Sequence, residues 1–335
     1  MVNKHSYTAA NQFPLKVLLN KELLESIEQD KDIIPVHLQL CPTNKCNLNC
    51  EYCSCKDRDK NEELSLDEDI RQIIYAISGY MSAVTITGGG EPLLHPEINE
   101  IIDNIYNSLT HLCDVGLVTN GLLLDKLDKH SLEELVWCRI SFDGNRPLEH
   151  LDVIREAIMD MPQNTVDWAF SFVVNGNKEA YNSFKNLASI IELVEFLEHT
   201  KFTHIRVVSD IYNPERSSKQ MEFIKNELKK GGFNTEKVIW QPRASYTKGA
   251  KKCYVSLLRP TIGADGQIYP CCGAQYMYPD TPRNFQGSMG HYSELPEIIE
   301  EQRFFDGSKC VKCYYNAYNE VLGLLLDGME HKEFV

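Results

Sequence analysis

The sequence predicts an α/β fold in which a helix-covered parallel sheet is followed by a small cysteine-rich region. Between residues 35 and 240, six short β-branched or apolar runs alternate with longer amphipathic segments. Because parallel neighbouring strands need a crossover connection, this alternation is typical of βα units with right-handed connections. Beyond residue 250 the alternation stops, and cysteine, glycine and proline become frequent.

The chain begins with a short segment that precedes the first predicted strand. Apolar residues between Leu15 and Ile27 recur at roughly helical spacing, which predicts one amphipathic helix. Residues 1–34 are therefore expected to form an N-terminal helical cap over an open end of the domain.

Six strands follow in order, each recognised as a short run rich in β-branched and apolar residues. They are Pro35–Leu40, Ala83–Thr87, Val115–Thr119, Cys138–Phe142, Trp168–Val174 and Thr203–Val208. The intervening segments have helical periodicity, and Ser65 with Glu68 forms a capping-box pair that opens the first of them. Residues 35–240 are predicted to be one sheet-and-helix domain.

Composition restricts the classes of partner and compartment. The chain has 335 residues and a net charge of −14, which matches a phosphate backbone poorly and argues against nucleic acid. No apolar run approaches the length of a membrane span, and the N-terminus lacks an apolar signal core. We therefore expect a cytoplasmic protein without membrane contact, whose 12 cysteines stay reduced and indicate metal binding.

The most informative stretch is the loop after the first strand. Cys46, Cys50 and Cys53 form a Cys-x3-Cys-x2-Cys pattern, and closely spaced thiolates suit zinc or an iron–sulfur cluster. Three thiolates leave one iron of a four-iron cluster open, as in a site that binds a cofactor or substrate.

This loop, with Tyr52 before its last cysteine, resembles the signature of the radical S-adenosylmethionine (SAM) enzymes. The resemblance implies a partial (β/α)6 TIM-type barrel over residues 35–240 and a [4Fe-4S] cluster whose open iron chelates SAM. An electron from that cluster, supplied by a flavodoxin- or ferredoxin-like reductant, would cleave SAM to a 5′-deoxyadenosyl radical.

Further motifs occur at the strand ends where this family binds SAM. Gly88-Gly-Gly-Glu-Pro92 resembles the motif that holds the methionyl ammonium, and two later strands end at Asn120 and Ser141. The resemblance thus implies cofactor contacts by Tyr52, Gly89, Gly90, Glu91, Asn120 and Ser141. From the residues alone, each polar strand-end residue can equally be a turn or cap residue.

The C-terminal region holds a second cysteine pattern. Cys253 is followed by Gly266 and Cys271, with a hairpin signal at Asp265-Gly266, and then by Cys310-x2-Cys313. This resembles the SPASM/Twitch auxiliary-cluster domains, and it implies a second [4Fe-4S] cluster held by Cys253, Cys271, Cys310 and Cys313. Because Cys313 is the last cysteine, we expect a small α+β Twitch-like domain over residues 250–330 with one auxiliary cluster. Cys272 adjoins Cys271 and is an alternative ligand.

Three functions remain open at this level. A radical SAM oxidoreductase would use the auxiliary cluster as electron acceptor for net oxidation, a dehydrogenation or crosslink, of a small molecule or peptide. A redox-neutral peptide epimerase would return a hydrogen atom from a thiol or tyrosine, with Cys272 as the candidate catalytic donor. A non-enzymatic zinc-binding module would use the same thiolates, because four cysteines are equally suited to zinc.

Overall fold

The computed structural model describes residues 15–108, 113–159, 161, 166–176, 180–242, 247–275 and 287–331. Ten strands form one sheet in the order β10-β9-β8-β1-β2-β3-β4-β5-β6-β7, which does not close into a complete barrel. They are β1 (His37–Leu40), β2 (Ala83–Ile86), β3 (Asp114–Thr119), β4 (Leu135–Asp143), β5 (Asp167–Val174), β6 (His204–Ser209), β7 (Val238–Gln241), β8 (Thr261–Ile262), β9 (Gln267–Tyr269) and β10 (Gly290–His291).

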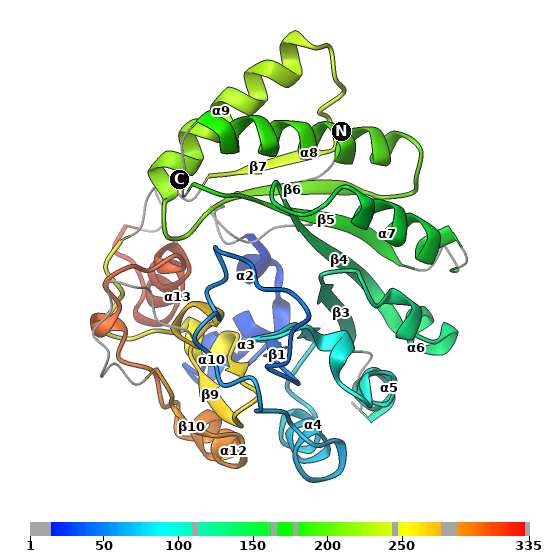
Figure 1. Cartoon of the computed structure of the whole chain (residues 1–335). Coiled ribbons are helices and arrows are strands. Elements are labelled where there is room, and N and C mark those ends of the chain that lie inside the picture. Colours follow the sequence, from blue (N-terminus) through cyan, green and yellow to red (C-terminus); the bar gives the residue numbers. More distant parts are fainter. Residues whose placement is uncertain are drawn as a thin grey trace.

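The helices lie mainly outside the curve of this sheet (Figure 1). Those of the sheet domain are α4 (Arg71–Ile77), α5 (Ile98–Ser108), α6 (Lys129–Glu134), α7 (Glu149–Met159), α8 (Ala180–Glu198) and α9 (Pro214–Lys230). The remainder are α2 (Leu15–Leu19), α3 (Lys21–Gln29), α10 (Val255–Leu258), α11 (Cys272–Gln275), α12 (Leu295–Glu300) and α13 (Asn316–Asp327). None of the helices in the described ranges is long and apolar enough to cross a membrane.

All six predicted strands are present and parallel, which confirms the α/β class and the partial-barrel fold. The structure adds a seventh parallel strand, β7, which pairs with β6. The sequence analysis did not predict this strand, because its apolar run, Val238-Ile-Trp240, is shorter than the runs by which the other six strands were recognised.

The predicted Asp265-Gly266 hairpin is also present. β8 and β9 pair antiparallel, and Gly266 adopts φ +72°, a conformation that glycine allows without steric cost. β8 pairs in parallel with β1, so the hairpin extends the barrel sheet instead of starting a separate one. The domain boundary near residue 250 stays a prediction, and the sheet continues across it.

Two local details differ from expectation. The N-terminal segment forms two short helices, because Asn20 interrupts the run and caps α3 by accepting a hydrogen bond from the Leu23 amide. At the start of the first crossover helix, Ser65 caps the Glu68 amide as predicted, but the Ser65 amide donates to Asp69 and not to Glu68. The reason is that this turn, Leu66–Ile70, is π-helical, which shifts the returning acidic side chain by one residue.

The sheet has two chemically different faces. Strand residues that point outward, such as Leu38, Leu117 and Phe172, are fully buried against the helices and form the main core. The alternating residues on the concave face are more polar, for example Gln39, Arg139 and Ser171, and the first two are only partly buried. This period-2 division gives the sheet a more polar face on the inside of its curve.

Candidate radical SAM site and a four-cysteine site

The cysteine loop lies at the carboxyl end of β1 and is fixed at its base. Thr43 bridges antiparallel to Glu63, and the Asn44 amide donates to the Glu62 carbonyl at 3.0 Å. Within the loop, the Cys53 amide donates to the Cys50 carbonyl at 3.1 Å, which turns the chain so that both thiols face one cavity. The chain therefore presents its three thiols on an anchored loop.

This cavity, called here the first cavity, has a volume of about 290 Å³. The cysteine loop forms one wall, and the carboxyl ends of β2 to β6 form the other, as expected for ligand sites in parallel sheets. Every residue predicted for the SAM site lines it: Cys46, Cys50, Cys53, Tyr52, Gly89, Gly90, Glu91, Asn120 and Ser141. Residues separated by almost a hundred positions in sequence thus meet around one space.

The glycine motif is packed directly against the cysteine loop. Gly90 donates its amide to the Thr43 carbonyl at 3.1 Å, and the Glu91 amide donates to the Lys45 carbonyl at 2.7 Å. A Cβ atom on Gly90 would overlap the Lys45 carbonyl oxygen. Glycine is therefore required at this position by the contact between the two backbones, whether or not a ligand also approaches it.

The Glu91 carboxylate is deeply buried and bound by donors of the protein itself. It accepts hydrogen bonds from Thr119 Oγ1 at 2.6 Å, the Asn120 amide at 2.6 Å and the Leu93 amide at 3.1 Å. Burial raises its pKa, and these bonds oppose the rise. Glu91 therefore fixes the end of β3 beside β2, and its contact with a methionyl ammonium stays a prediction.

Tyr52 connects the cysteine loop to β4. Its hydroxyl donates to Asp143 Oδ2 at 3.0 Å, and burial raises the pKa of both side chains. Burial, with the Asp143 charge added, also raises the pKa of the Cys50 thiol to about 11. Burial and the Asp143 charge thus disfavour the Cys50 thiolate. A metal ion that replaces the thiol proton would compensate the thiolate charge, because cysteine binds metals as the thiolate.

Arg58 contacts the third cysteine of the loop. Its guanidinium donates to the Asn44 and Cys55 carbonyls, and Nη1 lies 3.8 Å from Cys53 Sγ. A hydrogen bond from the Cys55 thiol lowers the pKa of Cys53 to about 6, and Arg58 acts in the same direction. The loop thereby stabilises Cys53 as a thiolate, the form that binds metal.

Sequence reasoning did not identify Arg146, a second buried cation of the first cavity. Its guanidinium stacks over the Phe142 ring at 4.5 Å and donates to the carbonyls of Asn120, at 2.9 Å, and Ser141. Its Nη2 is buried without a hydrogen-bond partner in the described chain. Arg146 follows the Asp-Gly turn after β4, and that position in a turn is a weak signal without the fold.

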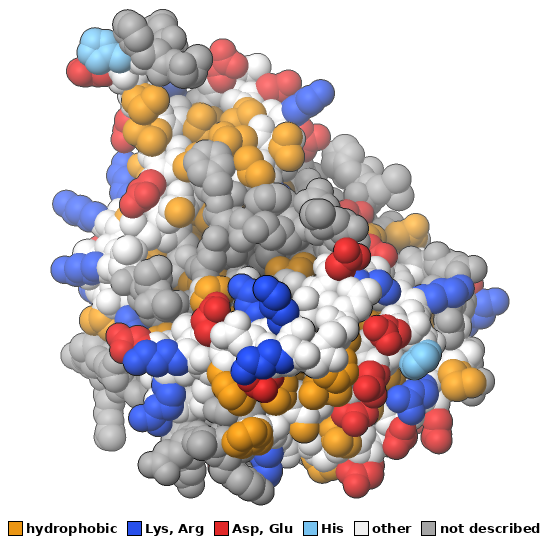
Figure 2. All heavy atoms as spheres, turned by 90° about the horizontal axis from the view of Figure 1, so that it is seen from above, with side chains coloured by type: hydrophobic (Ala, Val, Ile, Leu, Met, Phe, Trp, Pro, Cys, Tyr) orange, Lys and Arg blue, Asp and Glu red, His pale blue; other side chains and the backbone are white. Residues whose placement is uncertain are grey.

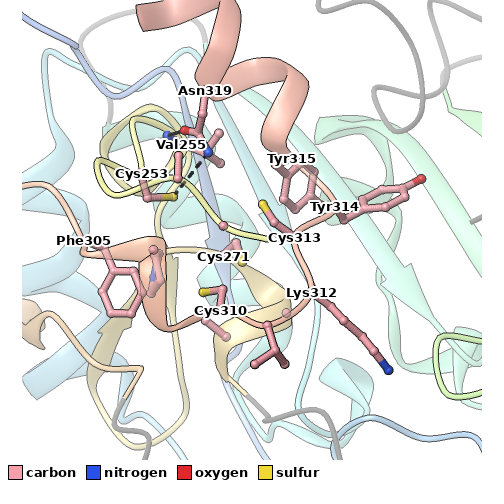
Figure 3. Close-up of a pocket in the computed structure, with 17 residues that line it drawn as sticks. Cys253, Val255, Cys271, Phe305, Cys310, Lys312, Cys313, Tyr314, Tyr315 and Asn319 are labelled. Carbon is pink, nitrogen blue, oxygen red and sulfur yellow. Dashed lines mark hydrogen bonds between the residues drawn. The ribbon is translucent and has the colours of Figure 1, made fainter. Parts of the chain in front are cut away.

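The four distal cysteines line a second cavity of about 50 Å³. Cys271 follows β9, Cys253 precedes α10, and Cys310 and Cys313 lie on the loop before α13 (Figure 3). Backbone bridges hold these segments together, because Thr247 pairs with Cys313 and Cys253 pairs with Phe305. The predicted set of four is therefore brought together around one enclosed space.

The structure distinguishes the adjacent cysteines 271 and 272. Cys271 lines the second cavity, whereas Cys272 is exposed and its Sγ lies 3.9 Å from Tyr315 Oη. Burial, reinforced by neighbouring cysteines, raises the pKa of Cys271 well above its usual range. By its position, Cys271 belongs to the four-cysteine site and Cys272 does not. A hydrogen-donor role for Cys272 stays a prediction.

The remaining cysteines belong mainly to the core. Cys113 and Cys138 are 2% and 0% exposed, as expected for small apolar residues beside or within strands. Cys41 is likewise buried at the end of β1, and Cys55 lies against Cys53.

The spacing of the thiols bears on the kind of metal. Within the described ranges, one group of three potential metal ligands has all its ligand atoms within 4.8 Å of one another. It consists of Asp103, His130 and Glu134, on α5 and α6. A tetrahedral zinc ion with Zn–S bonds of about 2.3 Å would hold its sulfurs about 3.8 Å apart. Among the described residues, no three cysteines of either cavity have all their sulfurs within 4.8 Å of one another, so neither set is arranged as a closed tetrahedral zinc site.

Comparison with known protein families gives a match over the segment that carries the candidate SAM site. The family model of the Radical SAM superfamily matches residues 40–172, the segment that carries the cysteine loop, the glycine motif and the ends of β3 and β4. Residues 40–172 of the chain are therefore a segment of the Radical SAM type.

Its relatives of known sequence include GTP 3′,8-cyclases. That of Clostridium perfringens (strain SM101 / Type A) is 30% identical over 215 residues, which cover 58% of this chain and 63% of that protein. The probable GTP 3′,8-cyclase of Methanocaldococcus jannaschii is 38% identical over 176 residues, covering 48% of this chain and 58% of that protein. The chain thus matches less than two thirds of the length of either relative.

Solved structures with a similar fold include two SAM-bound proteins. Streptococcus suis SuiB bound to S-adenosylmethionine gives a TM-score of 0.56 at 16% identity, covering 90% of this chain and 74% of that one. Native anSMEcpe with bound AdoMet gives 0.52 at 15% identity, covering 88% and 96%. At these identities the likeness concerns the fold alone.

Proposed function

We propose that this protein is a radical SAM enzyme that cleaves SAM reductively in the first cavity and abstracts a hydrogen atom from a substrate in the barrel. The observation that carries this proposal is the convergence of three thiols, the glycine motif and the strand ends on one space of about 290 Å³. A [4Fe-4S] cluster bound by Cys46, Cys50 and Cys53 would supply the electron that cleaves SAM to methionine and a 5′-deoxyadenosyl radical.

The residues around that space suit the charges of SAM. Gly89, Gly90 and Asn120 offer backbone and amide groups at the strand ends, and the acidic side chain of Glu91 adds negative potential for the methionyl ammonium. Arg146 lines the same cavity with a buried guanidinium nitrogen that lacks a partner in the described chain, which favours a carboxylate there. Enclosure by the cysteine loop would exclude water from the radical.

The second cavity supports an auxiliary [4Fe-4S] cluster of the SPASM/Twitch type. Cys253, Cys271, Cys310 and Cys313 would occupy all four irons, and a fully ligated cluster suits electron transfer better than substrate binding. We therefore favour net oxidation of the substrate, a dehydrogenation or crosslink, with a flavodoxin- or ferredoxin-like protein as the reductant.

A redox-neutral epimerase is the second candidate. It is supported by the exposed thiol of Cys272, which lies outside the second cavity and beside Tyr315. Product analysis separates the two reactions, because oxidation removes two hydrogens while epimerisation incorporates one solvent deuterium without such loss.

The comparisons suggest two classes of substrate, a nucleotide and a peptide. The GTP 3′,8-cyclases are named for a nucleotide substrate, whereas the SuiB and anSMEcpe structures include complexes with peptides. Small molecules and peptides are both proposed here as substrate classes.

The test of the proposed function is SAM cleavage. Anaerobically purified protein with dithionite and SAM is expected to form 5′-deoxyadenosine and methionine in equal amounts, even without the natural substrate. Protein that holds its iron–sulfur clusters but forms no 5′-deoxyadenosine would contradict the proposal.

A further inference from the structure

Lysine side chains flank the four-cysteine site on two segments of the chain. Residues 247–253 contain Cys253, and residues 305–313 contain Cys310 and Cys313. The two segments carry five lysines and one acidic residue, so their net charge is positive although the whole chain carries −14. The five lysines are Lys248, Lys251, Lys252, Lys309 and Lys312.

The two segments lie side by side. Thr247 bridges antiparallel to Cys313, and the Gly249 amide donates to the Cys310 carbonyl at 3.0 Å. The contact is close, since a Cβ atom on Gly249 would overlap the Gly307 carbonyl oxygen. Lysines that are distant in sequence are therefore held on adjoining stretches of backbone beside the second cavity.

Four of these lysines, Lys248, Lys251, Lys252 and Lys309, are exposed. None of the four forms an ion pair with another residue of the described chain. Lys252 Nζ lies 5.9 Å over the Phe304 ring, a contact that holds the side chain without neutralising its charge. The exposed charges are therefore available to a partner.

The acidic residue of the two segments is bound within its own loop. Asp306 Oδ1 accepts hydrogen bonds from the Ser308 amide at 3.0 Å and from Ser308 Oγ at 2.6 Å. These bonds lower the pKa of Asp306, and the charges of Lys309 and Lys251 act in the same direction. Both lysines thus lie near one carboxylate although they belong to different segments, which places them on the same part of the surface.

The loop between Cys310 and Cys313 adds an apolar group. Val311 lines the second cavity and is 47% exposed. Figure 3 shows that the neighbouring Lys312 side chain extends away from the four sulfurs. An apolar side chain with charged side chains around it is typical of protein–protein contact surfaces.

The sign and the place of the charge indicate the kind of partner. On the face drawn in Figure 2, acidic and basic side chains are interspersed, whereas basic side chains dominate the two segments. Complementary charge orients a partner and speeds its association, so a positive surface favours an acidic protein. Because the surface borders the four-cysteine site, such a protein would lie close to any group that the cysteines hold.

Nucleic acid matches the charge of these segments less completely. Proteins that bind single strands interleave basic side chains with aromatic side chains or arginines on which the bases stack. The two segments contain no arginine, and their aromatic residue, Phe305, lines the second cavity. An acidic protein is therefore the partner that the surface fits better.

We propose that residues 247–253 and 305–313 form a docking surface, called here the lysine surface, for an acidic electron-transfer protein that carries a flavin or an iron–sulfur group. This inference rests on the proposed function, in which the four-cysteine site accepts an electron from the substrate. In each encounter the group held by the cysteines is oxidised by one electron and the partner is reduced by one electron, and no covalent bond forms or breaks.

The test uses the full chain with its clusters reconstituted and, as the probe, an oxidised flavodoxin of strongly negative net charge. The association rate is measured by stopped-flow fluorescence of the flavin. For the wild type we expect this rate to fall as the salt concentration rises, because salt screens the opposite charges. The double variant Lys251→Glu/Lys309→Glu should associate ~10-fold more slowly at low ionic strength and depend less on salt.

Lys129→Glu/Lys225→Glu is the matched control. It changes the net charge of the chain by the same amount, and its two lysines are exposed on α6 and α9, outside the lysine surface. It should associate with the flavodoxin at the rate of the wild type.

Three results overturn the inference: the flavodoxin does not bind, the Lys251→Glu/Lys309→Glu protein associates as fast as the wild type, or the control slows association equally. A single-stranded oligonucleotide is tested on the same proteins. If the oligonucleotide binds the wild type but not the Lys251→Glu/Lys309→Glu protein, while the flavodoxin binds neither, the surface is assigned to nucleic acid instead.

Assaying 5′-deoxyadenosine in the same samples separates this failure from that of the proposed function. Protein that cleaves SAM, but whose association with the flavodoxin ignores the lysines, retains the proposed function and loses the docking surface. Protein that binds the flavodoxin through the lysines but cleaves no SAM retains the docking surface and loses the proposed function.

Discussion

Replacing Cys46 by alanine is expected to abolish 5′-deoxyadenosine formation and to remove about four irons per chain, the content of one cubane. Cys46 shares the first cavity with Cys50 and Cys53, and two thiolates cannot hold a cluster that leaves one iron open for SAM. Because the electron for SAM cleavage would come from this cluster, the expected loss of activity is complete within detection. Iron and 5′-deoxyadenosine are measured on the same anaerobic preparation.

Cys113→Ala serves as the matched control. Cys113 is 2% exposed and lines neither cavity, so its loss should leave iron content and SAM cleavage unchanged. A Cys46→Ala protein that still produced 5′-deoxyadenosine would refute the assignment of the first cavity.

The second large effect concerns the adjacent cysteines of the C-terminal region. Cys271→Ala should lose about four irons, whereas Cys272→Ala should keep the full complement. The physical reason is that Cys271 lines the second cavity with three other thiols, while Cys272 is exposed beside Tyr315. The Cys271→Ala protein should still form 5′-deoxyadenosine, because the first cavity is built from other residues.

Cys272→Ala is at once the control and a test of the second candidate function. If it lost the irons and Cys271→Ala kept them, the assignment of the ligand would be reversed. If it kept the irons and 5′-deoxyadenosine formation but no longer incorporated solvent hydrogen into the product, the epimerase would be favoured over the oxidoreductase.

Much of the fold could be predicted because its signals are local. Runs such as Trp168–Val174 are long enough to be recognised as strands, and Asp265-Gly266 marks its hairpin by turn chemistry. β7 was missed because its apolar run, Val238-Ile-Trp240, is shorter than those of the strands that were recognised. That β8 pairs with β1 depends on contacts between residues more than 200 positions apart, and no local pattern encodes this pairing.

In the candidate sites, too, local features could be predicted from the sequence and features that depend on distant residues could not. The thiols and the glycine motif are visible in the sequence because their spacing is fixed within one loop. The roles of Glu91 and Arg146 are not, because both depend on residues at the end of β3: Glu91 accepts hydrogen bonds from Thr119 and Asn120, and Arg146 donates to the Asn120 carbonyl.

The most direct test of the whole account is the content of iron and acid-labile sulfide in anaerobically purified wild-type protein. Two cubanes, one in each cavity, predict about eight irons and about eight sulfides per chain. Stoichiometric zinc without labile sulfide would contradict the account, because neither cavity would then hold the cluster on which the proposed chemistry depends.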